Sequence, residues 1–300
     1  MYKKYILSIC IPSYNRADHL RKNLKFISRI VQTLPVEIVV SDDASKDSTA
    51  EVIRNFIRDN NNVHIVHNIN KRNVGFDRNI LKMIKLASGQ FCWLLGDDDI
   101  PTKGSIKKII NIIKKYPKLS LIHLNYSRYD NVLKKTTAPR MINGINQDTI
   151  FSKKEDFYFM PIKNSYFKFL GTHTITMSSN VVNRSRWISV SRSVKKFIGH
   201  NFIHSFIIAN IIRTDNSVYF VSKPLVQYLS NNHRIWPNNI WKDYNSVLLD
   251  YLFSLGYPKD KLNYMRNQQL EYEKREFMSK NKFISKLYFT ALKIYNWIIK

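Results

Sequence analysis

Glycine is scarce in this chain of 300 residues: the sequence has only eight, and they never stand in a G-x-G spacing. Dinucleotide-binding loops and the Walker loop need closely spaced glycines, so that backbone N–H groups can approach phosphates. The sequence excludes both. It also lacks the glycine-rich loop that a sugar nucleotidyltransferase carries after its first strand, since residues 11–16 contain no glycine, and the protein-kinase signature set is missing.

Cysteine and long apolar runs are nearly absent as well. The two cysteines, Cys10 and Cys92, fit neither a disulfide framework nor the Cys/His spacing of a zinc site. Both fall in apolar stretches, so we interpret them as core residues of a protein in a reducing compartment. No apolar run approaches the roughly 20 residues needed to cross a bilayer. The run near the start ends at Pro12, so we expect no signal peptide.

Acidic residues are outnumbered, because 22 Asp and Glu stand against 48 Lys and Arg, a formal net charge of +26. Such an excess favours phosphate-bearing partners such as nucleic acid, nucleotide sugars or anionic lipid headgroups. A composition rich in Lys, Asn and Ile throughout explains it equally well, so the charge alone identifies no partner. Hydrophobic residues make up 44% of the chain, which is enough for a core and excludes a disordered protein.

The first 125 residues alternate between short apolar runs and amphipathic segments. The runs predict buried strands, and apolar positions three and four residues apart predict helices between them. This alternation indicates an α/β fold with a mostly parallel sheet covered on both faces, whose ligands bind beyond the carboxyl ends of the strands. The predicted strands are residues 7–11, 36–40, 63–66, 91–95 and 119–124, and the predicted helices begin at Asp18, Asp47–Thr49, Phe76 and Ser105.

The pattern is looser after residue 126. We expect loop or edge structure at 131–148, a strand within 172–182, a helix at 200–212, and short strands at 218–221 and 225–229.

The last twenty residues, 281–300, form a separate unit in which lysines alternate with apolar residues at helical spacing, with Trp297 among them. A basic amphipathic helix with aromatic residues is typical of proteins that bind an anionic membrane surface. A helix packed on the domain or in a dimer has the same pattern.

Three consecutive carboxylates, Asp97, Asp98 and Asp99, follow the apolar run 91–95 after the single residue Gly96. Adjacent carboxylates repel one another, and a divalent cation or a metal-bound polyanion would stabilise them. In a chain with so few acids, this triplet is a candidate metal site for a phosphorylated substrate.

Polar residues also follow the other predicted strands. Ser13–Arg16 offers an aromatic ring and hydrogen-bond donors suited to a nucleobase, although turns often contain such residues. Asp42 and Asp43 can accept from a pyrimidine N–H or from ribose hydroxyls, whereas Asp47 is explained as a helix cap. The helix start at 73–79, with its arginine, attracts phosphate oxygens or is an ordinary capped helix.

Four of these segments, in this order, resemble the nucleotide-sugar-binding half of family 2 glycosyltransferases: residues 9–16, 39–49, 73–79 and 96–99. Within that family, residues 73–79 and 93–99 resemble bacterial O-antigen abequosyltransferases, as do the shorter segments 178–182, 186–187, 197–199 and 222–226. The first likeness covers about residues 5–125, and the second extends thinly over 165–230.

The resemblance implies a GT-A fold, a nucleoside-diphosphate-sugar donor, a Mg²⁺ or Mn²⁺ ion and inversion at the anomeric carbon. By matching position, it implies metal binding by Asp97 and Asp99, with Asp99 the direct ligand. It also implies a larger set of donor-binding residues: Pro12, Tyr14, Asn15, Arg16, Asp42, Asp43, Asn73, Gly75, Arg78, Asp97 and Asp98.

The catalytic base departs from the family pattern. The family usually has an acidic pair at the start of a late helix, whereas this chain has His200 and His204 in the comparable stretch. In a helix the two imidazoles would lie one turn apart, and one of them would be the base or a third metal ligand. A hydrogen-bonded structural histidine is the alternative for each. The acidic pair Glu155–Asp156 is explained by helix capping.

These observations predict a metal-assisted, inverting glycosyltransferase that moves a sugar such as a dideoxyhexose to a polyprenyl-diphosphate-linked O-antigen or related saccharide. We expect it at the cytoplasmic, inner face of the bacterial plasma membrane, with a donor-binding half at 1–125, an acceptor-binding half at 126–230 and a helical C-terminal region at 231–300. The alternatives are an inactive sugar-nucleotide-binding homologue and a basic nucleic-acid-binding protein. The second leaves the carboxylates at three strand ends unexplained, so we expect no nucleic acid partner.

Overall fold

The computed structural model describes residues 5–130, 134–160, 172–215, 217–230 and 240–280. It begins with four parallel strands joined by helices, and each was predicted from the apolar pattern. β1 pairs with both β2 and β4, and β2 pairs with β3, so the carboxyl ends of all four strands meet at one edge. The elements are β1 (Leu7–Ser13), α1 (Ala17–Val31), β2 (Val36–Asp42), α2 (Thr49–Asp59), β3 (Ile65–Ile69), α3 (Phe76–Leu86) and β4 (Phe91–Leu94).

The second half of the chain completes the same sheet. The ten strands take the order β3-β2-β1-β4-β9-β6-β10-β5, with β7 paired to β6 and β8 to β10. β9 runs antiparallel between β4 and β6, and β10 is parallel to β6. The sheet elements and their short connections are β5 (Ile100–Pro101), α4 (Ser105–Lys115), β6 (Leu121–Asp130), β7 (Lys135–Ala138), β8 (Thr149–Phe151), α5 (Lys154–Tyr158), β9 (Asn180–Asn183), α6 (Arg184–Val190), α7 (Ile203–Thr214) and β10 (Val218–Ser230).

Three expectations for the second half are corrected. Residues 172–179 form the short 3-10 turns η1 (Thr172–Ile175) and η2 (Met177–Ser179), and only Asn180–Asn183 is a strand. The reason is local: the Asn180 side-chain amide donates to three carbonyls of these turns, which holds them out of the sheet. The two short strands at 218–229 are one strand, β10, with a register shift between Val221 and Val226. The helix expected from residue 200 begins at Ile203.

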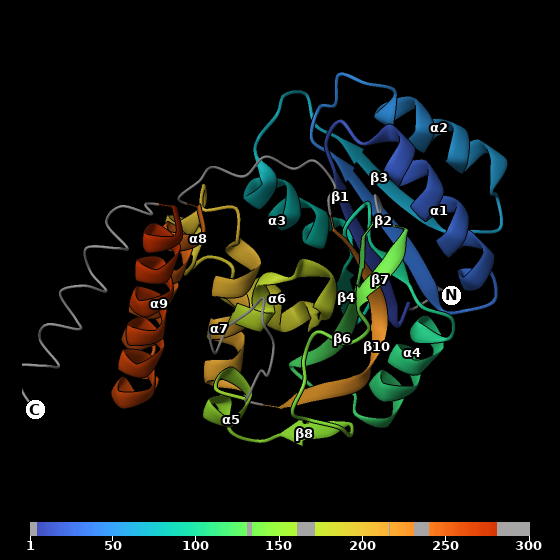
Figure 1. The fold of residues 1–300 in the computed structure, drawn as a ribbon. Helices are drawn as coiled ribbons and strands as arrows, with labels where there is room; N and C mark the ends of the chain where they lie inside the picture. Colours follow the sequence, from blue (N-terminus) through green and yellow to red (C-terminus); the bar gives the residue numbers. More distant parts are fainter. Residues whose placement is uncertain (1–4, 131–133, 161–171, 216, 231–239, 281–300) are drawn as a thin grey trace, which may run out of the picture.

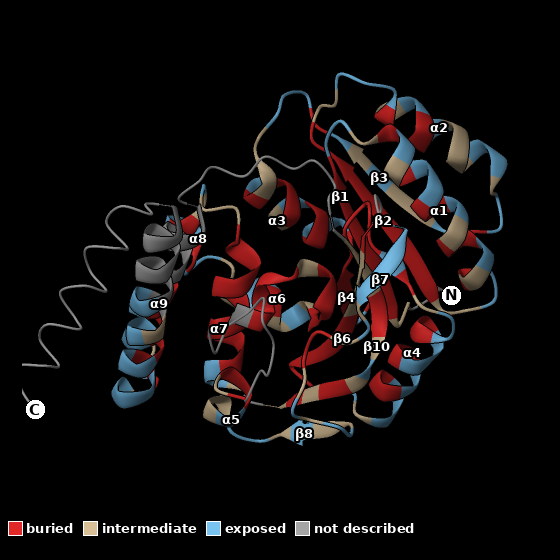
Figure 2. Cartoon of the chain, in the orientation of Figure 1, coloured by how far each residue is buried: buried red, intermediate tan, exposed pale blue. Residues whose placement is uncertain are grey.

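Helices cover both faces of the sheet (Figure 1): α1, α2 and α4 lie on one side, and α3, α6 and α7 lie on the other. Every residue of β1, β2 and β4 is buried, and Figure 2 shows exposed residues mainly on the outer sides of the helices. The predicted core cysteines, Cys10 and Cys92, are buried free thiols on neighbouring strands. The fold class predicted from the sequence is therefore confirmed.

One acid at the carboxyl edge starts two helices. Asp47 accepts from the N–H of Ala17 (3.1 Å) in α1 and from the N–H of Thr49 (3.0 Å) in α2. Burial acts to raise the pKa of Asp47, but these hydrogen bonds outweigh it and the pKa is lowered. Asp18, predicted to open α1, lies exposed in its first turn and pairs with Arg21 instead.

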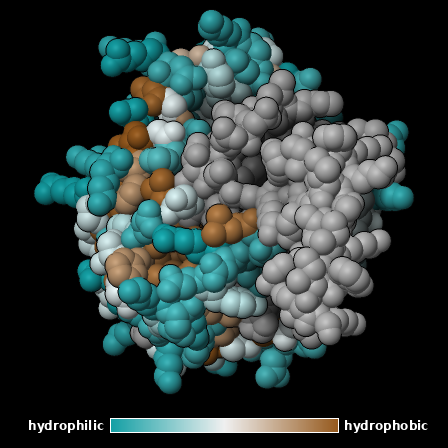
Figure 3. Space-filling model, turned by 60° about the vertical axis from the view of Figure 1, so that its left-hand side comes forward, coloured by the Kyte–Doolittle hydropathy of each residue, from teal (hydrophilic) through white to brown (hydrophobic). Residues whose placement is uncertain are grey.

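Two further helices, α8 (Ile240–Ser254) and α9 (Lys259–Lys280), stand beyond α7 (Figure 1). The Tyr257 hydroxyl donates to the Ala209 carbonyl of α7 (3.2 Å), which fixes the connection between them. Within the described residues, none of the helices combines the length and the apolar character needed to cross a membrane. The predicted amphipathic helix at 281–300 lies outside the described residues. The described surface in Figure 3 is mainly hydrophilic, with small, separate apolar patches.

Two histidines are packed together in the core. The rings of His123 and His173 lie 5.0 Å apart, and Phe157 contacts both edge-on. His123 Nδ1 bonds to the Asn180 side-chain oxygen (3.0 Å), whereas His123 Nε2 and both nitrogens of His173 have no hydrogen-bond partner within the described ranges. Burial lowers the pKa of His123 to about 4, and that of His173 well below its usual value. Both imidazoles are therefore neutral in the folded protein near pH 7.

This pair predicts a stability that falls in acid. Unfolded histidines titrate near 6.5, so below that pH the unfolded state binds more protons and the free energy of unfolding decreases as the pH falls toward about 4. His173→Phe should reduce this decrease, because the phenyl ring takes up no proton. Urea unfolding at pH 7, 6 and 5 measures the slope. His67→Phe, at an exposed position on β3, should keep the slope of the original protein, and equal slopes for both variants would contradict the assignment.

Candidate active site

The three acids that follow β4 lie in a tight turn, Gly96–Asp99, at the carboxyl edge of the sheet. The Asp99 N–H closes this acidic turn by donating to the Gly96 carbonyl (3.3 Å). Asp97, Asp98 and Asp99 are only 1%, 7% and 4% exposed. A buried carboxylate needs hydrogen-bond donors or a counter-charge, so the partners of each acid decide what it is free to do.

Asp97 and Asp98 share the side chain of Arg16. The guanidinium donates from Nη2 to Asp98 Oδ2 (2.9 Å), and its Nε lies 3.9 Å from Asp97 Oδ1. The Ser13 hydroxyl donates to the other oxygen of Asp97 (2.8 Å). The end of β1 thus supplies a positive charge and a hydroxyl to two adjacent acids that would otherwise repel each other.

Asp99 is turned the other way, into the protein. Its Oδ1 accepts from the N–H of Leu229 in β10 (3.2 Å), and its Oδ2 accepts from the Ser178 hydroxyl in η2. Both oxygens therefore have protein donors. In this structure Asp99, which the sequence singled out as a metal ligand, joins the end of β4 to two segments from the second half of the chain.

The two acids that follow β2 differ in the same way. Asp42 Oδ1 accepts from the N–H of Ser45 (3.1 Å) and from its hydroxyl, but Asp42 Oδ2 is buried and has no hydrogen-bond partner among the described residues. Burial raises the pKa of Asp42 against these hydrogen bonds. Asp43 instead accepts from the N–H groups of Val74 and Gly75 and from the Asn70 amide, all at 2.9 Å. Asp43 holds the loop before α3, whereas Asp42 keeps one acceptor atom available.

The residues at the end of β1 and just after it also divide into exposed and structural groups. The Tyr14 ring is 42% exposed, whereas Pro12 is buried in β1 opposite Ser41. Asn15 has a left-handed backbone (φ 53°), and its side-chain oxygen accepts from the Lys46 N–H (2.7 Å). Asn15 thus ties the loop after β1 to the loop after β2, and Tyr14 is left as an aromatic surface at the edge.

The loop before α3 leaves its polar residues in solvent. Asn73 and Arg78 are exposed, and the Asn73 side-chain oxygen accepts from the Gly75 N–H (3.0 Å). Gly75 has φ 86°, a conformation that other residues rarely adopt. Arg78 stands in the first turn of α3, where backbone N–H groups favour an anion.

Asp77, also in the first turn of α3, fixes the start of α7. It accepts from the N–H groups of Gly199 (2.8 Å), Asn201 (2.9 Å) and Ile203 (3.1 Å). Gly199 and Asn201 have positive φ angles of 111° and 62°, which bring alternate N–H groups onto one carboxylate. This turn is why α7 begins at Ile203 rather than at residue 200.

The two candidate bases are consequently separated. His200 lies in the turn before α7, half-buried against Phe197 and Phe206, so the expected spacing of one helical turn is wrong. His204, in α7, is 1% exposed, and its Nε2 bonds to the Ile175 carbonyl (2.8 Å). Burial lowers the pKa of His204, and its Nδ1 has no hydrogen-bond partner in the described part of the chain. His204 is therefore a neutral imidazole with one nitrogen held and one lone pair unused.

The structure thus brings the predicted strand ends to one edge, and it adds three residues that were not among the predicted site residues. Ser178 and Asn23 bond to the acidic turn, and Asp77 holds the turn before α7. Asp77 carried a weak signal, because acids are common in the first turn of a helix. Asn23 carried none, and Ser178 had only its place in the segment 178–182 that resembles abequosyltransferases. The partners of both residues are more than 70 residues away in the chain.

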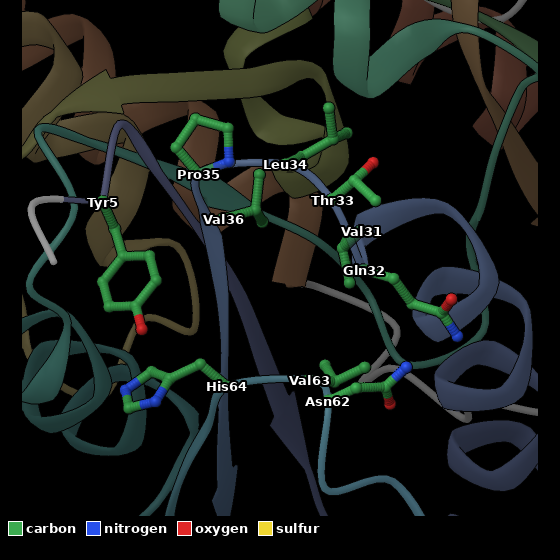
Figure 4. A pocket seen from close by; sticks show the side chains of 10 residues that line it. All are labelled: Tyr5, Val31, Gln32, Thr33, Leu34, Pro35, Val36, Asn62, Val63 and His64. Atoms are coloured by element: carbon green, nitrogen blue, oxygen red, sulfur yellow. The ribbon is translucent and has the colours of Figure 1, made fainter.

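Across the described ranges, no three His, Cys, Asp or Glu side chains are grouped so as to hold a metal ion by themselves. A cavity of about 340 Å³ lies at the opposite edge of the sheet, where β1 and β2 begin. Figure 4 shows the Tyr5 ring over His64 at its side, with centroids 4.8 Å apart. The carboxylates described above lie at the other ends of the strands, so this cavity is separate from them.

Sequence comparison identifies the class of protein. The profile of Glycosyl transferase family 2 matches residues 8–182, more than half of the chain, and the protein belongs to this family. The abequosyltransferase RfbV of Salmonella typhimurium is 30% identical over 223 residues, 74% of this chain and 66% of that protein. A GalNAc(5)-diNAcBac-PP-undecaprenol beta-1,3-glucosyltransferase of Campylobacter jejuni is 27% identical over 161 residues, 54% of this chain and 50% of that protein. The chain therefore spans half to two thirds of these relatives.

Solved structures show the same fold. Residues 1–349 of S. aureus TarS in complex with UDP superpose with a TM-score of 0.63 and 14% identity, over 92% of this chain and 75% of that one. A Pyrobaculum calidifontis mannosyltransferase in complex with GDP-Man and Mn²⁺ gives a TM-score of 0.53 at 12% identity, over 89% and 69% of the two chains. These likenesses confirm the GT-A fold expected from the resemblance.

Proposed function

We propose that this protein transfers a sugar, with inversion, from a nucleoside-diphosphate donor bound at the carboxyl edge of β1, β2 and β4. The observation that carries the proposal is a difference in hydrogen bonding among the acids at that edge. Most are occupied by protein donors, but Asp42 Oδ2 is buried without one, at the edge where the Tyr14 ring is exposed. Membership of Glycosyl transferase family 2 supports this reading.

In the proposed site each free group has a role in donor binding. Asp42 accepts a hydrogen bond from a nucleobase N–H or a ribose hydroxyl, and the Tyr14 ring stacks on the base. Arg78 and the N-terminus of α3 attract the diphosphate. Pro12, Asn15, Asp43, Asn73 and Gly75 shape the loops that present these groups, as their contacts indicate.

The acidic turn suits a divalent cation whose coordination is shared between protein carboxylates and the bound substrate. Mg²⁺ is usually held by one or two carboxylates together with substrate phosphates rather than by the protein alone. Asp97 and Asp98 already share a cation, the Arg16 guanidinium, which stands in for part of that charge. Asp97 and Asp99 are the residues proposed to hold the metal. Asp99 would do so through lone pairs that its hydrogen bonds from Leu229 and Ser178 leave unused, because each carboxylate oxygen has two. When bound, it would offset the charge that develops on the leaving nucleoside diphosphate.

Thermal unfolding with a panel of nucleoside diphosphates, with and without Mn²⁺, tests the donor site. One base should raise the melting temperature selectively, and Mn²⁺ should add to the shift, because ligands that bind only the folded state stabilise it. Asp42→Asn should weaken the selective shift, since the amide replaces an acceptor by a donor at one position. Asp18→Asn, at an exposed position on α1, is the control and should behave as the original protein. No shift with any nucleotide would contradict the proposal.

For the base we propose His204. Its Nε2 is held by the Ile175 carbonyl, so the unpartnered Nδ1 is the nitrogen able to take a proton from an acceptor hydroxyl. Because burial lowers the pKa of His204, the imidazole stays neutral, and hence able to accept, below the usual histidine range. Asp77 positions the turn that leads into this helix.

Replacing the base should stop transfer without preventing donor binding. His204→Gln should lower the transfer rate by about 10²- to 10⁴-fold while the nucleoside-diphosphate shift in melting temperature is retained. Transfer is measured as release of nucleoside diphosphate in the presence of acceptor, and His200→Gln is the matched control. If His200→Gln alone abolishes transfer, the roles are reversed; if neither does, the base is another group.

The proposed acceptor is a saccharide on a polyprenyl diphosphate, as the name of the Campylobacter jejuni relative favours. Such an acceptor stays in the membrane, and the basic, aromatic segment 281–300 would bring the protein to its anionic inner surface.

Deleting residues 281–300 should therefore reduce co-sedimentation with anionic vesicles and leave the nucleotide-induced shift in melting temperature unchanged. Equal sedimentation of both forms would remove the segment from the proposal. No nucleic acid partner is proposed, and the transfer assay separates an active enzyme from an inactive homologue.

A further inference from the structure

The acidic turn is held by two buried side chains from other parts of the chain. The Ser178 hydroxyl accepts from the Gly96 N–H (2.8 Å) and donates to Asp99 Oδ2. Ser178 is itself held in place, because its carbonyl accepts from the Trp93 indole N–H (2.8 Å). One hydroxyl therefore uses both its lone pair and its proton on the same turn, which a methyl group in its place cannot do.

Asn23, a residue of α1, also holds the acidic turn. Its side-chain amide in α1 donates to the Gly96 carbonyl (3.0 Å) and to the Asp99 carbonyl (3.1 Å). Ser178 thus bonds the first N–H and the last carboxylate of the turn, and Asn23 bonds its first and last carbonyls. Both residues are buried, at 0% and 3% exposure.

The acidic turn has little room to move between the hydrogen bonds from Ser178 and Asn23. A Cβ added at Gly96 would lie 2.8 Å from Asp99 Oδ2 and 3.2 Å from Asp98 Oδ1, so the carboxylates fold back onto the glycine. Asp97 and Asp98 lie between the two ends that Ser178 and Asn23 hold. Asp97 accepts from the Ser13 hydroxyl, and Asp98 accepts from the Arg16 guanidinium. Because the acids repel one another, their positions depend on the groups that hold the ends of the turn.

From this geometry we infer that Ser178 and Asn23 are positioning residues for the donor site, which set the proposed metal ligands Asp97 and Asp99, and Asp98 between them, where a metal-bound diphosphate meets them. The inference rests on the proposed function. Groups of this kind around metal-binding carboxylates change metal affinity by about 10- to 100-fold when removed, although they touch neither metal nor substrate. The two residues act through the turn and take no part in the chemistry.

The test compares two neighbouring serines. Ser178→Ala and Asn23→Ala should each weaken nucleoside-diphosphate binding in the presence of Mn²⁺ by about 10-fold or more, with metal-free binding little changed. Ser179→Ala is the matched control: Ser179 is equally buried, but its hydroxyl donates to the Thr176 carbonyl (2.6 Å) of its own turn. It should keep the Mn²⁺ enhancement of the original protein. If Ser178→Ala binds as Ser179→Ala does, the inference is overturned.

A second measurement does not depend on the ligand. Hydrogen exchange over residues 91–99 should speed up in Ser178→Ala, because the Gly96 N–H loses its acceptor, and should stay unchanged in Ser179→Ala. Unchanged exchange in Ser178→Ala overturns the inference whether or not a nucleotide binds. If exchange is faster in Ser178→Ala but the original protein binds no nucleotide, Ser178 does hold the turn, and the proposed function is contradicted instead.

Discussion

Buried carboxylates at the carboxyl edge of the sheet are the constraint on which the loops of this protein depend. Asp43 holds the loop before α3, Asp77 holds the turn before α7, and Asp99 holds the end of β10, each by accepting backbone N–H groups. A buried carboxylate deprived of its donors costs several kcal/mol, so each acid and its loop order one another. The segments of the second half of the chain are thereby joined to the first at the edge where a ligand of the family would bind.

The number of hydrogen-bond donors around each acid separates the structural acids from the acids that can still accept a further hydrogen bond. Asp42 retains a buried oxygen without a partner, and Asp97 and Asp98 share one guanidinium. In a chain of net charge +26, the edge that would receive a negatively charged donor is the place where acids are concentrated. Acids repel phosphates, so this arrangement favours a donor that arrives with a cation, which is the physical link between the acidic turn and the proposed metal.

Much of the first half of the fold was predictable, because its signals are local. The apolar runs and the three- and four-residue spacing reproduced every strand and helix up to α4 except the two-residue β5, with small shifts at the ends. The second half was harder. Residues 172–179 have the composition of a strand, but the Asn180 amide holds them as 3-10 turns. The start of α7 moved to Ile203 because a carboxylate of α3 captured the preceding N–H groups.

The sequence by itself determined that polar groups follow β1, β2 and β4, and that parallel strands bring them to one edge. The tertiary structure alone decided which of these groups are already occupied. Asp42 and Asp43 are adjacent in sequence, yet one keeps a free oxygen and the other has three donors. The reason is that hydrogen-bond partners such as Ser178 come from distant segments, and no periodicity or motif in the chain records which distant donor reaches which acid.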